Sequence, residues 1–210
     1  QLMSKIAEIL GREKDSRKYN ELSDHIKKGY HYNYTKKGKI YSNRQCKYVR
    51  PVALDLISEE EKKEAMNLLN EKCMENEYKI GTGFLTTPFI LPLLCEYGYV
   101  DTAYKILLNK DRPGWLYEIK KGATTIWENW NGIDEDGVPI DSFNHYLMGS
   151  VVGWLFSHVA GIRPLQAGFH EIVIEPYPNP SLTHVNAKFI SASGLIKSSW
   201  KYEGDIFILR

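Results

Sequence analysis

The sequence predicts a mainly α-helical chain with a small β part, in which helix hairpins run to about residue 163 and the first strands of an antiparallel β domain follow. Apolar residues recur at steps of three and four up to about residue 159, as in amphipathic helices, and then alternate with a period of two, as in half-buried strands. Helices paired by short loops repeat about every 40 residues, which indicates a toroid or solenoid of α-hairpins. The segment 161–168 is the expected boundary between domains 1–163 and 164–210.

Four helices are expected in the N-terminal part of the chain. They are predicted over residues 1–10, about 15–30, 43–56, and from Ser58 onward. Gly11 supplies a stop for the first helix, and Pro51 should kink the third. Ser58 followed by Glu61 has the spacing of a capping box, which opens the fourth.

Three helices and four strands are expected in the remainder. The helices are predicted from Pro88 to about Tyr97, from Thr102 to Leu108, and from Ser142 to Val159; the strands are predicted over 171–175, 184–190, 195–200 and 205–209. Thr87 and Asp101 are expected to cap the first two of these helices. The last helix is apolar nearly all round and is therefore expected to be buried, with Gly161 as its stop.

The composition restricts the classes of function. The chain has 210 residues, of which 43% are hydrophobic and 25% charged, so it is long and apolar enough to bury a core. Its net charge of +1 gives no electrostatic basis for a nucleic-acid or membrane partner. The 3 cysteines are odd in number and widely spaced, which fits neither a disulfide framework nor a zinc site, and reduced structural thiols are expected. No metal or cofactor is expected.

The two ends of the chain interrupt predicted elements. It begins inside an amphipathic pattern and ends inside a strand-like run, so we expect it to be a piece of a longer protein. No apolar run has transmembrane length. The compartment is left open, with the cytoplasm slightly favoured over secretion.

The stretch from Lys121 to Trp130 is the strongest candidate for chemistry. It places one carboxylate, Glu128, between two indoles, Trp127 and Trp130. Carbohydrate sites use this combination, because aromatic faces cover the apolar face of a sugar ring while carboxylates hold hydroxyls or move protons. A packed ring beside a capping charge near a helix start is an equally ordinary origin for the same residues.

Two further segments are candidates for ligand contact. The glycine-rich loop 81–85 would let backbone approach a ligand, although a plain tight turn has the same composition. Asn144 and His145, which are expected at the start of the last helix, carry hydrogen-bonding groups suited to sugar hydroxyls. A core histidine satisfied by a carbonyl is the alternative for His145.

Several motifs in order resemble the bacterial α-L-rhamnosidases. The motifs are Thr82-Gly-Phe-Leu85, Thr87-Pro88, Trp115-Leu-Tyr117, Gly122-Ala-Thr-Thr-Ile-Trp-Glu128-Asn-Trp130, Ser142-Phe-Asn-His-Tyr146, Gly149-Ser-Val, Trp154-Leu, Ala160-Gly-Ile162 and Gly194 to Trp200. The resemblance covers most of the chain and is strongest from about 80 to 202. It implies an inverting glycoside hydrolase built on an (α/α)6 barrel, of which this chain holds a partial toroid of helix hairpins followed by antiparallel β-sandwich strands.

The resemblance also implies roles for individual residues. Glu128 matches the family's general base, and His145 matches a histidine that contacts the sugar. The other implied contacts of the rhamnose-containing glycoside or oligosaccharide are Trp127, Trp130, Trp115, Thr82, Phe84 and Asn144. The family's general acid is another glutamate upstream of the matching segment, and no motif for it occurs here. The chain by itself is therefore expected to be inactive.

Two other functions remain open, together with one consequence of the partial barrel. The chain could belong to another (α/α)6 carbohydrate-active enzyme, or to a non-catalytic carbohydrate-binding or scaffold protein. A barrel cut open would expose apolar helix faces, so partial order, dimerisation or aggregation of this chain is expected.

Overall fold

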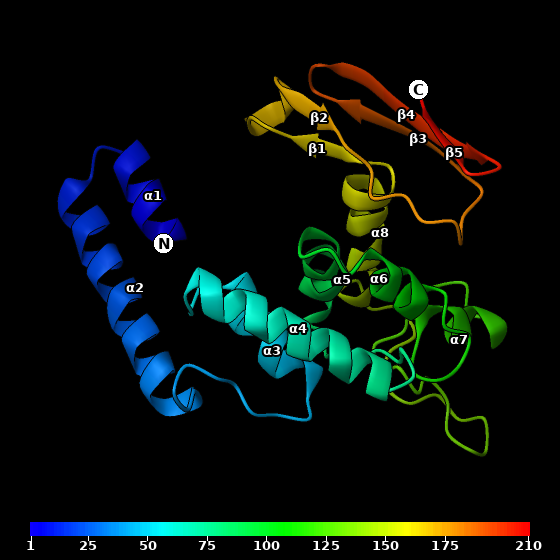
Figure 1. The fold of residues 1–210 in the computed structure, drawn as a ribbon, viewed down its shortest axis with the longest axis horizontal. Helices are drawn as coiled ribbons and strands as arrows, with labels where there is room; N and C mark the ends of the chain where they lie inside the picture. The colour runs from blue at the N-terminus through cyan, green and yellow to red at the C-terminus, as the bar shows by residue number, and fades with distance from the viewer. The chain divides into compact units, whose positions relative to one another are not determined.

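The computed structural model describes residues 1–210 and has helices up to Val159 followed by short strands (Figure 1). The mainly α fold with a small antiparallel β part is therefore as predicted. Two compact units divide the chain, residues 1–69 and 70–210, and this division falls inside a helix rather than between the helical and the strand parts.

The first unit contains the expected N-terminal helices. These are α1 (Leu2–Ile9), α2 (Glu13–Tyr34), α3 (Gln45–Ala53) and the first part of α4 (Glu59–Glu75). Helices α1 and α2 pack beside each other as a hairpin that turns at Gly11 (Figure 1), where a φ of 67° suits glycine. Pro51 lies within α3 and is buried.

The predicted capping box at the start of α4 is confirmed. The Ser58 N–H donates to Glu61 Oε2 at 2.8 Å, and the Glu61 N–H is 3.3 Å from Ser58 Oγ. Just before it, Asp55 accepts hydrogen bonds from Lys27 and Lys62 at 2.5 and 2.6 Å. These bonds hold the pKa of the Asp55 carboxyl well below its usual range.

The second unit contains shorter helices. They are α5 (Thr87–Glu96), α6 (Val100–Leu107), α7 (Trp115–Lys120), a 3-10 turn (Met148–Ser150), α8 (Val151–Trp154) and a π-helical turn (Leu155–Val159). Helices α5 and α6 pack against each other. Helix α7 was not predicted, because six residues are too few for an apolar period to be recognised.

Both expected caps in this unit are wrong. Thr86 holds the position before α5, and Thr87 lies inside the first turn, where its hydroxyl is 2.9 Å from Thr82 Oγ1. Asp101 also lies inside the first turn of its helix, and its carboxylate accepts a 2.5 Å hydrogen bond from the Asn179 side chain. In each case the polar side chain bonds a residue outside its helix, Thr82 five residues earlier for Thr87 and the distant Asn179 for Asp101.

The expected long helix from Ser142 to Val159 begins only at Met148. Residues 142–147 are irregular, because their backbone groups bond to another segment, as described below. The expectation of burial all round is also wrong, since Val152 is 52% exposed, although Val151 and Trp154 are buried.

The strands form two small antiparallel sheets. One pairs β1 (Ile162–Pro164) with β2 (Ile172–Ile174), and the other has the order β3 (His184–Ser191), β4 (Gly194–Glu203), β5 (Ile206–Leu209). All four predicted strands are present. Strand β1 was missed because it has three residues and ends in proline.

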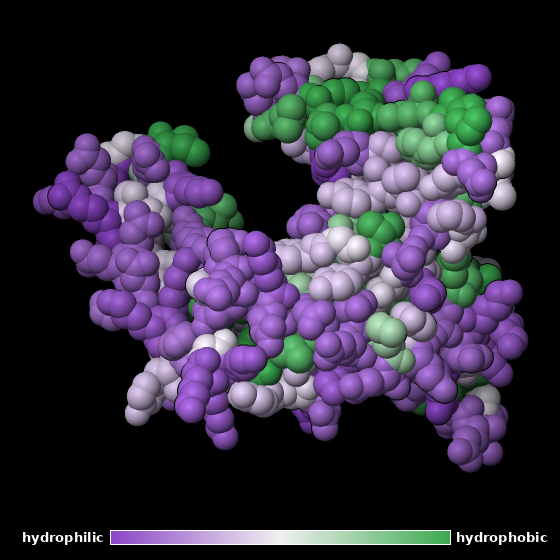
Figure 2. Space-filling view, in the orientation of Figure 1, coloured by the Kyte–Doolittle hydropathy of each residue, from purple (hydrophilic) through white to green (hydrophobic).

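The three-stranded sheet is attached to the end of the last helical stretch. The buried Trp200 indole on β4 donates to the Val159 carbonyl at 2.7 Å, and the Ser198 hydroxyl donates to the Ala160 carbonyl at 2.6 Å. Other apolar side chains on and beside the strands are exposed, namely Leu165, Ile190, Leu195, Ile206 and Leu209. Figure 2 shows hydrophobic surface gathered over this part of the chain.

The three cysteines are unpaired. Burial raises the pKa of Cys73 and of Cys95 to about 12, so both are neutral thiols packed in the core. None of the helices combines the length and the hydrophobicity that a membrane crossing requires.

Candidate active site

The candidate carboxylate lies in a segment that pairs with a second segment of irregular backbone. The Glu128 N–H donates to the Ser142 carbonyl at 2.9 Å, and the His145 N–H donates to the Ile126 carbonyl at 2.8 Å. The Ser142 N–H in turn is 3.3 Å from Glu128 Oε2. The Ser142 carbonyl is thereby taken from the bond that it would accept in a helix starting at Ser142, and the three bonds together bring the two motifs side by side.

Glu128 and His145 present polar groups at the surface of this pair of segments. The Glu128 side chain is 43% exposed, and its Oε1 lies 3.9 Å from His145 Nε2. This separation is too long for a direct hydrogen bond, so both groups keep capacity for a third polar partner. His145 is 22% exposed, and its ring stacks on Tyr146 with a centroid distance of 5.6 Å.

Phe84 adds an apolar surface to these polar groups. Its ring centroid lies 6.3 Å from that of His145, and the side chain is exposed. Asn144 is exposed as well, and its backbone N–H is 3.1 Å from Ser142 Oγ. Carboxylate, imidazole, amide and aromatic groups from three segments of the chain, which contain Phe84, Glu128 and residues 144–145, therefore lie near one another.

The two indoles Trp115 and Trp130 contact each other and link the neighbouring segments. The Trp130 Nε1–H donates to the Thr82 carbonyl at 2.8 Å, and the Trp115 ring meets Trp130 edge to face at 5.1 Å. Trp115 is buried and donates to the Met148 carbonyl at 3.0 Å. Thr82 is also buried. The hydrogen bond to Thr82 ties the loop 81–85 to the Glu128 motif.

Trp127 packs inside the protein. It is 4% exposed, and its ring stacks on Phe143 at 4.6 Å with an interplanar angle of 14°. Gly132 lies against the six-membered ring of the Trp127 indole, where a Cβ would come within 1.8 Å of Cε3. Its ring atoms therefore contact protein, and Trp127 fixes the residue beside it in the chain, Glu128.

One buried carboxyl next to the site was not singled out from the sequence. Glu118 on α7 is 1% exposed, and its Oε2 lies 3.4 Å from the Trp127 N–H. Burial raises its pKa to about 7, against the opposing effect of that N–H. The available signal was its spacing of three from Trp115, which puts a carboxylate on the buried face of a short helix. Phe143 and Tyr146 were likewise not assigned to the site.

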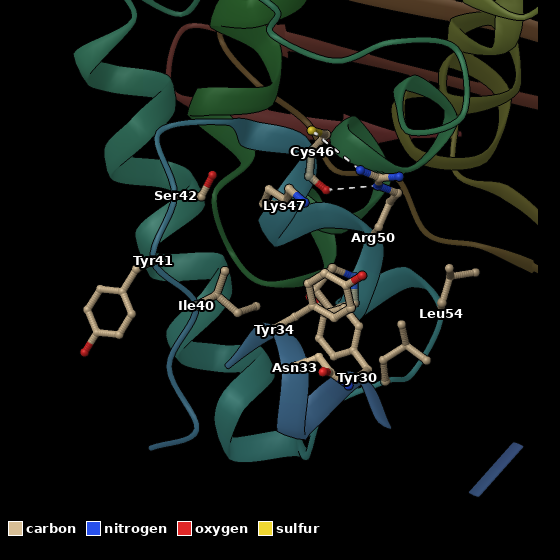
Figure 3. A pocket seen from close by; sticks show the side chains of 12 residues that line it. Tyr30, Asn33, Tyr34, Ile40, Tyr41, Ser42, Cys46, Lys47, Arg50 and Leu54 are labelled. Carbon is tan, nitrogen blue, oxygen red and sulfur yellow. Dashed lines mark hydrogen bonds between the residues drawn. The ribbon is translucent and has the colours of Figure 1, made fainter. Parts of the chain in front are cut away.

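A separate cavity of about 420 Å³ lies in the first unit (Figure 3). Tyrosines and basic side chains line it, among them Tyr30, Tyr34, Tyr41, Lys47 and Arg50. Its lining includes no carboxylate, so it lacks the acid and base that glycoside hydrolysis needs. Nowhere in the chain do three or more His, Cys, Asp or Glu side chains gather as metal ligands.

Comparison with known proteins gives consistent matches over the whole chain. Residues 1–159 match the bacterial α-L-rhamnosidase six-hairpin glycosidase domain, and residues 161–210 match the bacterial α-L-rhamnosidase C-terminal domain. An α-L-rhamnosidase of Formosa agariphila is 36% identical over 214 residues, and one of Streptomyces avermitilis is 35% identical over 213 residues. Each match covers 99% of this chain, but only 23% and 20% of the respective relative.

Solved structures agree with this assignment. The Streptomyces avermitilis α-L-rhamnosidase complexed with L-rhamnose is similar with a TM-score of 0.90 and 34% identity, over 98% of this chain and 20% of that one. The native enzyme of Aspergillus terreus is similar with a TM-score of 0.91 and 30% identity, over 98% and 24%. The helical hairpins, the following strands and the sequence motifs thus lead to one conclusion: the chain belongs to the bacterial α-L-rhamnosidase family of six-hairpin glycosidases.

Proposed function

We propose that the protein containing this chain hydrolyses terminal α-L-rhamnose from glycosides with inversion, and that Glu128 is its general base. The observation that carries the proposal is a half-exposed carboxylate held by the Ser142 N–H, with the His145 imidazole 3.9 Å away. A relative 34% identical in sequence was solved as a complex with L-rhamnose, which supports the choice of sugar.

In this mechanism the Glu128 carboxylate takes a proton from a water molecule as the water oxygen attacks the anomeric carbon. The bond from that carbon to the leaving oxygen breaks on the opposite face, where a second carboxyl group supplies a proton to the leaving group. An inverting site holds the two carboxyl groups about 6.5–9.5 Å apart to leave room for the water. The second group lies in the part of the protein upstream of this chain.

The remaining site residues hold the sugar or support those that do. We assign the exposed groups of His145 and Asn144 to hydroxyls, and the exposed Phe84 ring to the apolar face or the C5 methyl of rhamnose. Trp130 donates a hydrogen bond to the Thr82 carbonyl and packs edge to face with Trp115, so its position depends on both residues. Trp127 contributes through Glu128, its neighbour in the chain.

We further propose that residues 1–163 are the C-terminal portion of the catalytic barrel and that residues 164–210 begin a β-sandwich. The chain spans 20–23% of the length of the two curated relatives described above. The chain alone then has a base without an acid, and it is expected to release no rhamnose.

The test uses the full-length protein and a chromogenic α-L-rhamnoside, with the anomer of the product followed by proton NMR. Glu128→Gln should lower the rate by about 10²–10⁴, because general base catalysis contributes about that factor. Glu135→Gln is the matched control, since Glu135 is an exposed carboxylate in the next loop. The parent should release β-L-rhamnose first, and the control should behave like the parent.

Other outcomes point to the other functions. An active parent whose Glu128→Gln form keeps its rate would refute Glu128 as the base. First release of the α anomer would refute inversion. A parent that is inactive on rhamnosides but active on other glycosides would be a different (α/α)6 enzyme. A parent that binds sugar and cleaves none of a panel of deoxy-sugar and glucosyl substrates would be a binding or scaffold protein.

A further inference from the structure

We propose that Glu118 is a positioning residue that holds the Trp127–Glu128 backbone, and with it the Glu128 carboxylate, through its hydrogen bond from the Trp127 N–H. This inference rests on the proposed function, since it concerns the placement of the proposed base. The bond joins the short helix α7 to the middle of the motif segment, nine residues further along the chain.

The direction of the backbone N–H groups explains why a side chain is needed here. In a trans peptide, the carbonyl of one residue and the N–H of the next point to opposite sides. The Glu128 N–H and the Ile126 carbonyl bond to the segment 142–145, so the Trp127 N–H points away from it, toward α7. A buried backbone N–H without an acceptor is costly, and Glu118 Oε2 is the acceptor that this one has.

The burial of Glu118 excludes a direct contact between its carboxyl and a bound sugar. Glu118 is 1% exposed, so it does not reach a sugar that contacts Glu128. Its second oxygen, Oε1, has no hydrogen-bond partner, and a buried carboxyl with one bond is an expensive way to fill a core position. The raised pKa of Glu118 expresses that cost. The hydrogen bond from the Trp127 N–H is the one polar interaction of this carboxyl, and holding that N–H is the role we assign to it.

The Trp127 N–H belongs to the Ile126–Trp127 peptide, whose carbonyl accepts from the His145 N–H, so Glu118 and His145 hold this peptide from its two sides. Glu128 is the next residue, and the Trp127 ring before it is held by its stacking on Phe143. Without the bond from Glu118, this peptide is held from the His145 side alone and can tilt while the ring remains buried. The carboxylate would then be misplaced relative to the attacking water. A displacement of about 1 Å in such a group can cost a factor of about 100 in rate.

The experiment compares Glu118→Met, which has a similar size and no acceptor, with Glu118→Gln, which keeps an oxygen acceptor, in the full-length protein. Glu118→Met should lower kcat about 10- to 100-fold, with KM changed less than about threefold. Glu118→Gln should keep kcat within about threefold of the parent. Rates are measured well below the melting temperature of every variant, so that a loss of folded protein does not enter.

Hydrogen exchange provides a readout that does not depend on the reaction. In Glu118→Met, the amides of the peptide covering residues 125–130 should exchange faster than in the parent, whereas in Glu118→Gln they should not. If Glu118→Met does not fold, Glu118→Asp takes its place, because the shorter side chain withdraws the acceptor and should give the same two changes in smaller degree.

Each outcome decides the proposal. Unchanged exchange and unchanged kcat in the Met or Asp variant would overturn it, and so would a loss in Glu118→Gln as large as in Glu118→Met, which would mean that the acidic group itself takes part. A parent that cleaves no rhamnoside would instead refute the proposed function, and the exchange comparison would still decide whether Glu118 holds the segment.

Discussion

Gly132 is a position where one added methyl group should disturb the candidate site. It follows the Trp127-Glu128-Asn129-Trp130 run, has a φ of 61°, and has no room on its Cα. An ideal Cβ there would lie 1.8 Å from Trp127 Cε3 and 2.1 Å from Cζ3. The Trp127 ring has no free space to retreat into, because it already stacks on Phe143 at 4.6 Å. Gly132→Ala should therefore move either the ring or the loop.

The destabilisation expected from Gly132→Ala has two contributions, and a control variant separates them. A left-handed conformation costs a residue with a Cβ about 1–2 kcal/mol, and overpacking a filled site costs about 1–3 kcal/mol more. Gly137 lies in the same loop with a φ of 80°, and its Cβ would meet nothing within 4 Å. Gly137→Ala therefore carries the first cost alone, and the difference between the two variants should be about 1–3 kcal/mol.

The assay is hydrogen exchange of the peptide covering residues 126–132 in the full-length protein. A difference of about 1–3 kcal/mol in the free energy of local opening corresponds to about 5- to 150-fold faster exchange in Gly132→Ala than in Gly137→Ala. The rate on an α-L-rhamnoside should fall in the same order, since Glu128 follows Trp127 in the chain and would move with it. Equal exchange in the two variants would refute the packing described for Trp127.

Four further predictions concern stability and assembly. Gly161→Ala should destabilise the protein more than Gly98→Ala in thermal melts, because both have positive φ but only the Gly161 Cβ would meet backbone, at 2.2 Å from the Pro176 nitrogen. Ser58→Ala should cost about 1 kcal/mol through loss of the capping box, measured by urea unfolding, and no loss would contradict that role. Burial raises the Glu118 pKa from 4.5 to about 7, so the folded state holds the proton more tightly, and parent stability should fall by about 3 kcal/mol as pH rises from 4.5 to 7. Glu118→Gln should lack that fall, and parallel pH curves would refute it. The 210-residue chain alone should self-associate in sedimentation through its exposed apolar strand and helix faces, and a monomer at high concentration with a cooperative melt would count against this.

The sequence was sufficient for the elements whose stability is local. The capping box at Ser58 and Glu61 is made by groups three residues apart, so the pattern contains the whole interaction. The four strands were predicted because alternation and turn residues are also local signals. Thr87 and Asp101 were misassigned because their true partners, Thr82 and Asn179, are not helix groups of their own turn.

In the candidate site, too, local patterns predicted residue types but not the contacts between separate segments. The motifs identified Glu128 and His145 as residue types suited to a sugar. They did not predict that the two loops carrying these residues exchange backbone hydrogen bonds. That pairing ends the apolar period of the last helix at Met148, although Phe143, Tyr146 and Leu147 continue it in sequence. A helical period is only a preference of side chains for one face, and it is overridden where the backbone has stronger partners elsewhere.

The hydrogen bonds and ring contacts around Glu128 hold a segment that is neither helix nor strand. The Trp127 peptide is held on one side by Glu118 and on the other by the bonds of its neighbours to residues 142–145, while its ring is held by Phe143 and by the absence of a side chain at Gly132. The irregular pairing buries Trp127 and leaves the very next residue, Glu128, half exposed with a free oxygen toward His145. The role proposed for Glu128 requires a fixed backbone and an accessible carboxylate, and two adjacent residues, Trp127 and Glu128, combine them.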